Sequence, residues 1–201
     1  MFRGKRETPV NGTSATHPPT TPIQPSTYTL YLEVHNRNEL SLGDSRRRLG
    51  FSAYHWTILL SDKENKHFHV YDVTDGSSPD CVTREPKPDH EWTYRARNDV
   101  DPDTCESRLV RMTIGEVRAG LGPEIIKGLL QSVPLPVKGA VPEQSCVTWT
   151  KVALCKLRAH GYARWIGDVE MLVARALAYA DLRLADPKDS VGFIDYLGNQ
   201  V

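Results

Sequence analysis

The chain has 201 residues, of which 39% are hydrophobic, and its 25 basic and 25 acidic side chains give a formal net charge of zero. This length and composition are typical of one soluble globular domain with a sizeable core. The neutral charge argues against a protein that covers nucleic acid or an anionic membrane, and no segment approaches the roughly 18 consecutive apolar residues of a membrane span.

The first part of the chain, residues 1–26, is rich in proline and threonine and has almost no apolar residues. Such a segment cannot bury enough surface to offset its ordering entropy, so we expect a disordered tail followed by a single domain at 27–201. The N-terminus lacks the apolar core of a signal peptide, which predicts a cytoplasmic protein.

The cysteines show neither a CxxC pair nor zinc-finger spacing, so the sequence predicts no structural zinc and no redox dithiol. We expect all of them to be reduced in a cytoplasmic protein. They are Cys81, Cys105, Cys146 and Cys155.

The first predicted elements of the domain are strands. Residues 28–34 alternate apolar and polar side chains, which predicts a half-buried strand. Two β-rich runs, 51–60 and 67–73, flank a short polar link and predict a β-hairpin. In any register in which the paired residue numbers have an even sum, His55 and His69 project from the same face of this hairpin.

The remaining predicted elements include loops, one further strand and several helices. Residues 36–50 and 74–103 predict loops, and the second of these is long enough to be a functional lid or an insertion, with one strand-like stretch at 92–94. The others are a strand at 108–114, a short helix from Pro123 to Leu130, and a long helix that Asp168 caps and that buries Val169, Leu172, Ala176 and Tyr179 or Ala180.

The clearest helix begins at Cys146. Ser145 can cap its N-terminus, and Gly161 lies just beyond its last periodic residue. The unpaired N–H groups and the dipole of a helix N-terminus favour an anion, so this position can turn a thiol into a thiolate nucleophile. Alternatively, Cys146 is a small buried hydrophobic residue.

A thiol nucleophile needs a base, a polar group that orients the base, and donors for the oxyanion. We expect His55 to be the base, because the pKa of histidine lies near working pH, and His69 on the neighbouring strand to be the orienting group. The backbone N–H of Cys146, helped by Ser145 or Gln144, is the expected oxyanion donor.

Four short motifs carry a resemblance to a known superfamily. They are Tyr54-His55-Trp56, Phe68-His69-Val70, Val133-Pro134-Leu135-Pro136 and Ser145-Cys146-Val147-Thr148-Trp149. Their order resembles the circularly permuted papain-like superfamily, which includes lecithin:retinol acyltransferase-like and permuted amidase-like proteins, and is similar in particular to an uncharacterised family of small fungal proteins within it. The resemblance implies Cys146 as nucleophile, His55 as its base and His69 as the polar third member.

These observations together predict a single α+β domain in which an antiparallel sheet of about four to six strands packs against helices. We expect a cysteine-dependent hydrolase or acyl/amide transferase that forms a thioester at Cys146, acts on a small-molecule or peptide-like acyl substrate, and requires no cofactor. Trp56, Trp149 and residues 74–103 are the expected walls of its cleft.

Two other functions fit the same residues. His55, His67 and His69 offer three imidazoles to a divalent metal ion such as zinc, because His67 and His69 share one face of a strand. A non-catalytic binding module on the same fold is the other, since fold does not determine function. The binding-module hypothesis predicts that Cys146 has the reactivity of an ordinary thiol.

Overall fold

The computed structural model describes residues 27–62, 64, 68–76, 90–98, 101, 105–118, 122–186 and 193–195. The predicted tail at 1–26, most of the predicted lid at 74–103, and Cys81 lie outside these residues.

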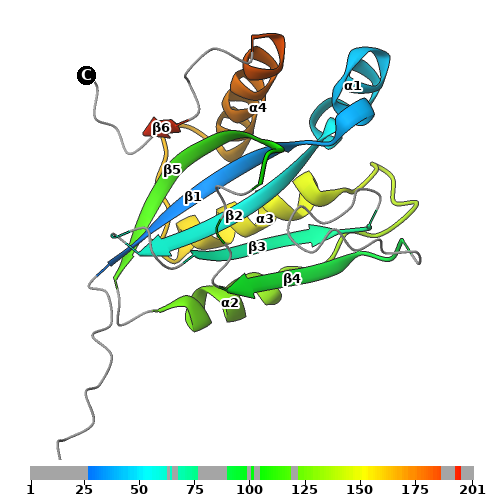
Figure 1. Cartoon of the computed structure of the whole chain (residues 1–201). Helices are drawn as coiled ribbons and strands as arrows, with labels where there is room; N and C mark the ends of the chain where they lie inside the picture. The colour runs from blue at the N-terminus through cyan, green and yellow to red at the C-terminus, as the bar shows by residue number, and fades with distance from the viewer. Residues whose placement is uncertain are drawn as a thin grey trace, which may run out of the picture.

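A six-stranded sheet forms the centre of the described part of the chain, with the strand order β4-β3-β2-β1-β5-β6 (Figure 1). Neighbouring strands are antiparallel, except that the short β6 runs parallel to β5. With helices packed on it, the sheet gives the predicted α+β fold. The strands are β1 (Thr27–Asn36), β2 (Tyr54–Asp62), β3 (Phe68–Thr74), β4 (Thr93–Asn98), β5 (Arg108–Arg118) and β6 (Phe193–Asp195).

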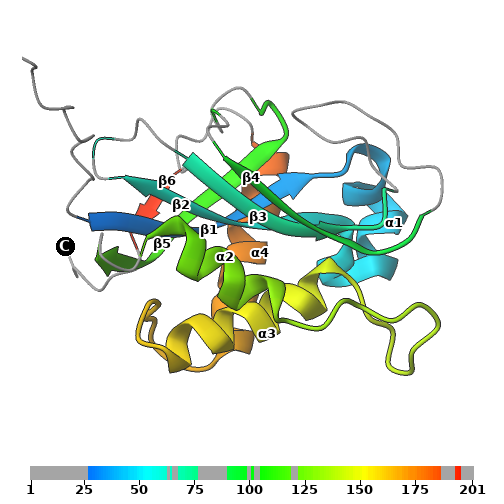
Figure 2. The same ribbon diagram turned by 90° about the horizontal axis from the view of Figure 1, so that it is seen from below.

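Three longer helices cover one face of this sheet. They are α2 (Pro123–Gln131), α3 (Cys146–Ala159) and α4 (Val169–Ala185), and Figure 2 shows α2 beside α3 beneath the strands. The predicted starts of α3 at Cys146 and of α4 after Asp168 are confirmed. The Asp168 carboxylate caps α4, since it accepts a hydrogen bond from the N–H of Met171 at 2.8 Å.

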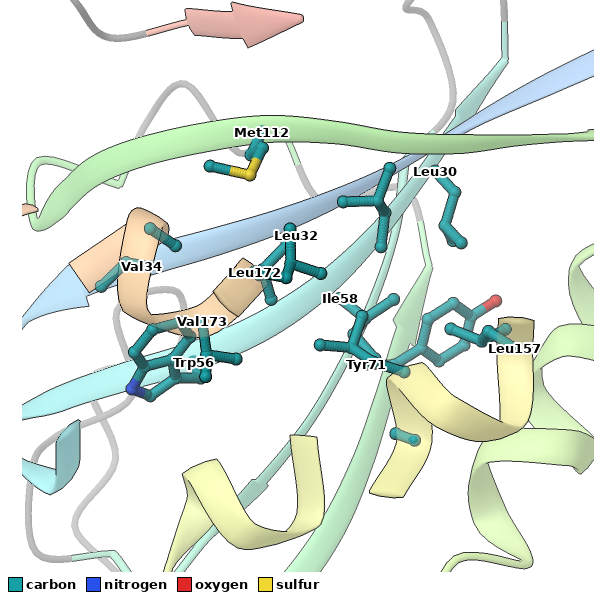
Figure 3. Packing of buried hydrophobic residues seen from close by; sticks show 14 of the residues in the cluster. Leu30, Leu32, Val34, Trp56, Ile58, Tyr71, Met112, Leu157, Leu172 and Val173 are labelled. Atoms are coloured by element: carbon teal, nitrogen blue, oxygen red, sulfur yellow. The ribbon is translucent and has the colours of Figure 1, made fainter. Parts of the chain in front are cut away.

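The core lies between these helices and the sheet. Side chains of β1 and β2 at even positions, including Leu32 and Trp56, pack there against Leu172 and Val173 of α4 (Figure 3). In the predicted inward stripe of α4, Leu172, Ala176 and Ala180 are fully buried. The even-numbered positions share a face because side chains alternate along a strand.

The opposite face of the sheet is buried too, which the alternation in residues 28–34 did not predict. Tyr31 and Leu59 form a small apolar cluster there with Phe68 and Val70. Further along the same face lie the buried polar residues Glu33, His35, Thr57, Asp72 and Arg111. Strand β1 is therefore an interior strand covered on both faces, and the prediction of a half-buried strand was wrong.

The segment predicted as a loop at 36–50 instead contains the short helices η1 (Asn38–Ser41) and α1 (Gly43–Leu49), followed by η2 (Gly50–Ala53). Helix α1 buries none of its residues, so it has no hydrophobic periodicity to reveal it. A bidentate ion pair from Arg46 to Asp181, with N···O distances of 2.6 and 2.7 Å, holds it against α4.

The predicted hairpin exists, but its register differs from the expected one. Strand β2 pairs with β3 as Ile58 with Tyr71, Leu59 with Val70 and Leu60 with His69, so the paired residue numbers have an odd sum. In such a register two odd-numbered residues of the two strands project from opposite faces. The prediction that His55 and His69 share a face was wrong.

Candidate functional site

Strands β2 and β3 part at one end of the sheet. Their pairing covers Ile58–Ser61 of β2 only, although β2 begins at Tyr54 and β3 continues to Thr74. The first residues of β2 therefore pair with β1 on one side, and among the described residues no strand pairs with their other edge. Backbone groups on that edge are available to side chains from α3.

Helix α3 directs its first residue, Cys146, at this open edge of β2. The thiol donates a hydrogen bond to the carbonyl of Tyr54 at 3.6 Å, and the backbone N–H of Trp56 bonds the sulfur. Burial raises the pKa of Cys146 to about 11, although Arg37 and the Trp56 bond act in the opposite direction. At neutral pH the group is therefore a protonated thiol.

The residue before Cys146 shapes the start of the helix. The backbone N–H of Ser145 donates to the Thr148 hydroxyl at 3.1 Å, and the Ser145 hydroxyl accepts a hydrogen bond from Ser52 at 2.9 Å. Ser145 therefore connects the first turn of α3 to the segment that leads into β2. Its hydroxyl oxygen acts as an acceptor in this contact, whereas the sequence predicted a donor to an oxyanion.

The imidazole of His55 reaches from β2 across the gap to β3. Its Nε2 lies 2.9 Å from Oδ2 of Asp72. Burial lowers the pKa of His55; the Asp72 bond opposes that shift, and the nearby His35 and Arg95 add to it. A neutral imidazole beside a carboxylate carries its proton on Nε2, which leaves a lone pair on Nδ1 that no described hydrogen bond engages.

Asp72 is fully buried and holds this imidazole in place. Its carboxylate also accepts two hydrogen bonds from Arg95, at 2.6 and 2.8 Å, and one from Arg97 at 3.0 Å. Burial alone would raise the pKa of Asp72, but the bonds from His55 and Arg95 outweigh it and hold the pKa far below its usual range. Asp72 is thus ionised at neutral pH.

Cys146, the predicted nucleophile, contacts the stretch of β2 that carries His55, the predicted base, but the two side chains do not bond to each other. Side chains of Tyr54 and Trp56 lie in the helix-side core with Cys146, whereas the His55 side chain between them leaves on the other face. The Cys146 thiol bonds the backbone on both sides of His55. No hydrogen bond joins the two side chains in the described structure.

The predicted third member, His69, is not part of this arrangement. It lies three positions before Asp72 on β3 and so projects from the other face, where its Nδ1 lies 3.0 Å from the side-chain oxygen of Asn98. The orienting group is Asp72, which the sequence analysis missed. The available signal was a lone carboxylate inside the apolar β-rich run 68–73.

The three-histidine metal site does not form as predicted. His55 and His69 lie on opposite faces of the sheet and cannot share one ion, and His67 lies outside the described residues. Within the described ranges no group of three His, Cys, Asp or Glu side chains could hold a metal ion.

The two tryptophans predicted to line a cleft belong to the core. Trp56 is fully buried and its indole N–H donates to the carbonyl of Phe51 at 2.9 Å, while Trp149 is 1% exposed and packs on Tyr94. The carboxamide oxygen of Gln144 accepts the N–H of Val137 at 2.8 Å, which fixes the preceding loop. Both tryptophans are thus buried in the helix-side core, which does not fit their predicted place in the wall of a cleft.

Comparison with known proteins gives one match. A family model described as "Family of unknown function (DUF6914)" matches residues 29–185. No curated protein and no solved structure matches the chain. Of the helices that the structure describes, none is both long and apolar enough to cross a membrane.

Proposed function

The chain belongs to the DUF6914 family of unknown function, and we propose that it is a cysteine-dependent acyl or amide transferase or hydrolase. Cys146 is the nucleophile, His55 the general base, and Asp72 the residue that orients His55. This assignment keeps the nucleophile and base that the resemblance to permuted papain-like proteins implies, and replaces His69 by Asp72.

The observation that carries the proposal is the hydrogen bond of 2.9 Å between His55 Nε2 and Asp72. It lies at the gap between β2 and β3, where the Cys146 thiol approaches the backbone that flanks His55. A carboxylate on one ring nitrogen and a lone pair on the other are what a catalytic base requires.

In the proposed reaction the thiol leaves the Tyr54 carbonyl and passes the edge of β2 that β3 leaves unpaired, to reach Nδ1 of His55 on the other face. Because burial raises the pKa of Cys146 to about 11, the proton passes to Nδ1 as the sulfur attacks the substrate carbonyl, rather than beforehand. The oxyanion that forms lies next to the N–H groups at the start of α3.

The second half of the reaction uses the same groups. The His55 imidazolium, stabilised by Asp72, gives its proton to the leaving group, and a thioester on Cys146 remains. Water or an amine then attacks the thioester carbonyl while His55 accepts its proton, and the C–S bond breaks to regenerate the thiol. A small-molecule or peptide-like acyl donor fits this chemistry, which uses no cofactor.

One observation favours a second candidate, a non-catalytic binding module. The Cys146 side chain is part of the helix-side core, and only 3% of the residue is exposed. A thiol that serves only packing has this burial and this backbone hydrogen bond.

The test is acylation of Cys146. The protein is incubated with a panel of thioesters and activated esters, and the acyl adduct is located by peptide mass spectrometry in the wild type and in His55→Ala. We expect an adduct on Cys146 whose formation is slower by about 10²- to 10⁴-fold in His55→Ala, the usual contribution of a general base.

Two control variants make the result specific. His69→Ala removes the imidazole that lies outside the proposed site, and Cys155→Ser removes an exposed thiol of the same helix. Both are expected to acylate Cys146 at the wild-type rate. Absence of any Cys146 adduct across the panel, or equal rates in wild type and His55→Ala, supports the binding module instead.

A further inference from the structure

The face of the sheet opposite the helices carries a second thiol beside an imidazole. Cys105, just before β5, places its sulfur 3.7 Å from Nδ1 of His35 on β1. Ser107 completes the contact, with its hydroxyl 3.1 Å from the same sulfur and 3.4 Å from the same nitrogen. The thiol is thus within hydrogen-bond reach of a base, unlike the thiol of Cys146.

The other side of the imidazole faces a carboxylate. His35 Nε2 lies 3.1 Å from the Thr57 hydroxyl and 3.4 Å from Oε2 of Glu33. Glu33, which is 1% exposed, also accepts a hydrogen bond of 2.7 Å from Arg111. A thiol, an imidazole and a carboxylate therefore follow one another, the order of groups in cysteine-based catalytic sites.

The backbone fixes this arrangement. The carbonyl of Ser107 accepts the N–H of Asn36 at 2.7 Å, and the carbonyl of Cys105 accepts the N–H of Arg108 at 3.2 Å. The first bond ties the segment before β5 to the end of β1, and the second fixes the turn that carries Cys105. The backbone therefore holds the thiol beside the imidazole.

The charges around His35 favour its protonated form. Burial would lower the pKa of His35, but its bonds to Cys105 and Glu33 outweigh burial and raise it to about 9. The titratable groups that face it are Cys105 and Glu33, with His55 at a ring-centroid distance of 6.2 Å and Arg111 behind Glu33. An imidazolium in contact with a thiol favours the thiolate.

We propose that Cys105 is a peroxide-reactive thiol, with His35 as its proton donor and Glu33 as the residue that positions His35. Only 6% of Cys105 is exposed, so the site selects small oxidants such as hydrogen peroxide over bulky acyl donors. This function is independent of the chemistry proposed at Cys146.

The reaction balances without another reactant. The Cys105 thiolate attacks the terminal oxygen of a hydroperoxide; an S–O bond forms and the O–O bond breaks. The leaving alkoxide or hydroxide takes the proton from the His35 imidazolium. The sulfur is oxidised by two electrons to a sulfenic acid, and the peroxide is reduced to an alcohol or to water.

The test is competitive oxidation of the thiols within one protein sample. The full chain is treated with substoichiometric hydrogen peroxide at pH 7, and the gain of one oxygen at each cysteine is followed by peptide mass spectrometry. We expect Cys105 to oxidise at least about tenfold faster than the exposed Cys155, because reactivity follows thiolate character.

His35→Gln keeps polar atoms at this position but removes the proposed proton donor, and is expected to abolish the advantage of Cys105. The matched control is His69→Gln, the same substitution at a histidine outside the network. Equal oxidation of Cys105 and Cys155 in the wild type, or an unchanged Cys105 rate in His35→Gln, overturns the proposal.

A second measurement covers the case in which His35→Gln does not fold. In the wild type, the oxidation rate of Cys105 is expected to stay nearly constant from pH 8 to pH 6, whereas a free peptide thiol slows about tenfold per pH unit. A Cys105 rate that falls in parallel with the free thiol contradicts the proposal. Neither outcome depends on acylation of Cys146.

Discussion

At the scale of single residues, one buried carboxylate decides how His55 can react. Asp72 accepts hydrogen bonds from His55 and from two arginines on the neighbouring strand, so it stays ionised. An ionised Asp72 can only accept, which assigns the donor role to Nε2 of His55. The lone pair on Nδ1 that the proposed base function requires therefore follows from Asp72.

We predict that His55 is neutral at pH 7 and carries its proton on Nε2, since burial lowers its pKa and Asp72 accepts from Nε2. Long-range ¹H–¹⁵N correlation spectra of the imidazoles report both the charge and the tautomer. Asp72→Asn, which can donate as well as accept, is expected to shift part of the population to the Nδ1–H form. A charged ring, or an Nδ1–H tautomer in the wild type, contradicts this assignment.

The residues that sequence alone identified are those with a local signal. Cys146 stands at the start of a helix with recognisable ends, and His55 lies in a β-rich run. Asp72 showed only as a lone carboxylate in an apolar run and His35 showed no signal, because their partners come from other strands and depend on the register of the sheet. The odd-sum register of the hairpin excluded His69 and selected Asp72, and that parity is not readable from one sequence.

At the scale of elements, β5 depends on a glycine where it lies against the segment between α3 and α4. A Cβ at Gly115 would lie 2.2 Å from the backbone oxygen of Tyr162 and 2.9 Å from Cα of Ala163. The N–H of Arg164 also donates to the carbonyl of Ile114 at 2.7 Å. The segment between α3 and α4 is thus bonded to the strand beside a position that has no room for a side chain.

Gly115→Ala is therefore expected to destabilise the fold by about 3 kcal/mol, because both contacts are backbone atoms that cannot move independently. The matched control is Gly128→Ala in α2, where an added Cβ meets nothing within 4 Å. That change should stabilise by about 0.5–1 kcal/mol, since alanine is the better helix former. Urea unfolding of both variants measures the two changes in the free energy of unfolding. An unchanged free energy in Gly115→Ala would show that the segment between α3 and α4 moves to make room for the new side chain.

The elements that the sequence predicted correctly are those that bury a regular face. Helices α3 and α4 have periodic apolar residues and capped N-termini, and the strands of the hairpin are continuous β-rich runs. Helix α1 was missed because it is held by the Arg46–Asp181 ion pair instead of by burial, and the three-residue β6 is too short to show a pattern.

At the scale of the whole molecule, the two faces of the sheet are stabilised differently. The helix side is an apolar core, whereas the other face combines a small apolar cluster with two charged networks, one around Asp72 and one around Glu33 and His35. Burying charges is favourable only while each keeps its partner. The stability of the domain should therefore depend on pH more steeply than its zero net charge suggests.

The alkaline side of this dependence is predicted to come from His35. Its pKa is about 9 in the folded chain against an ordinary 6.5, so its contribution is fully present below pH 6.5 and is lost as the pH rises through 9. At about 1.4 kcal/mol per unit, this contribution of His35 falls by roughly 3 kcal/mol across the window, but ionisation of Cys105 in the folded chain alone offsets it up to the ordinary thiol pKa of about 8.5. The lowered pKa values of Asp72 and Glu33 do not change the stability between pH 6.5 and pH 9, because the stability that they contribute is lost only as the pH falls below about 4.

Urea unfolding of Cys105→Ser, alone and combined with His35→Gln, between pH 6.5 and pH 9 isolates the part of this contribution that Glu33 supports. The curve of Cys105→Ser should fall and that of the double variant should stay nearly flat, because Cys105 is absent from both proteins and the other groups titrate alike. His69→Gln in the Cys105→Ser background serves as the control and should follow Cys105→Ser, since that ring contacts Asn98 outside the network. Parallel curves for Cys105→Ser with and without His35→Gln would mean that the imidazole gains no net stabilisation from Glu33, and that the polar face of the sheet is held by the arginine–carboxylate pairs alone.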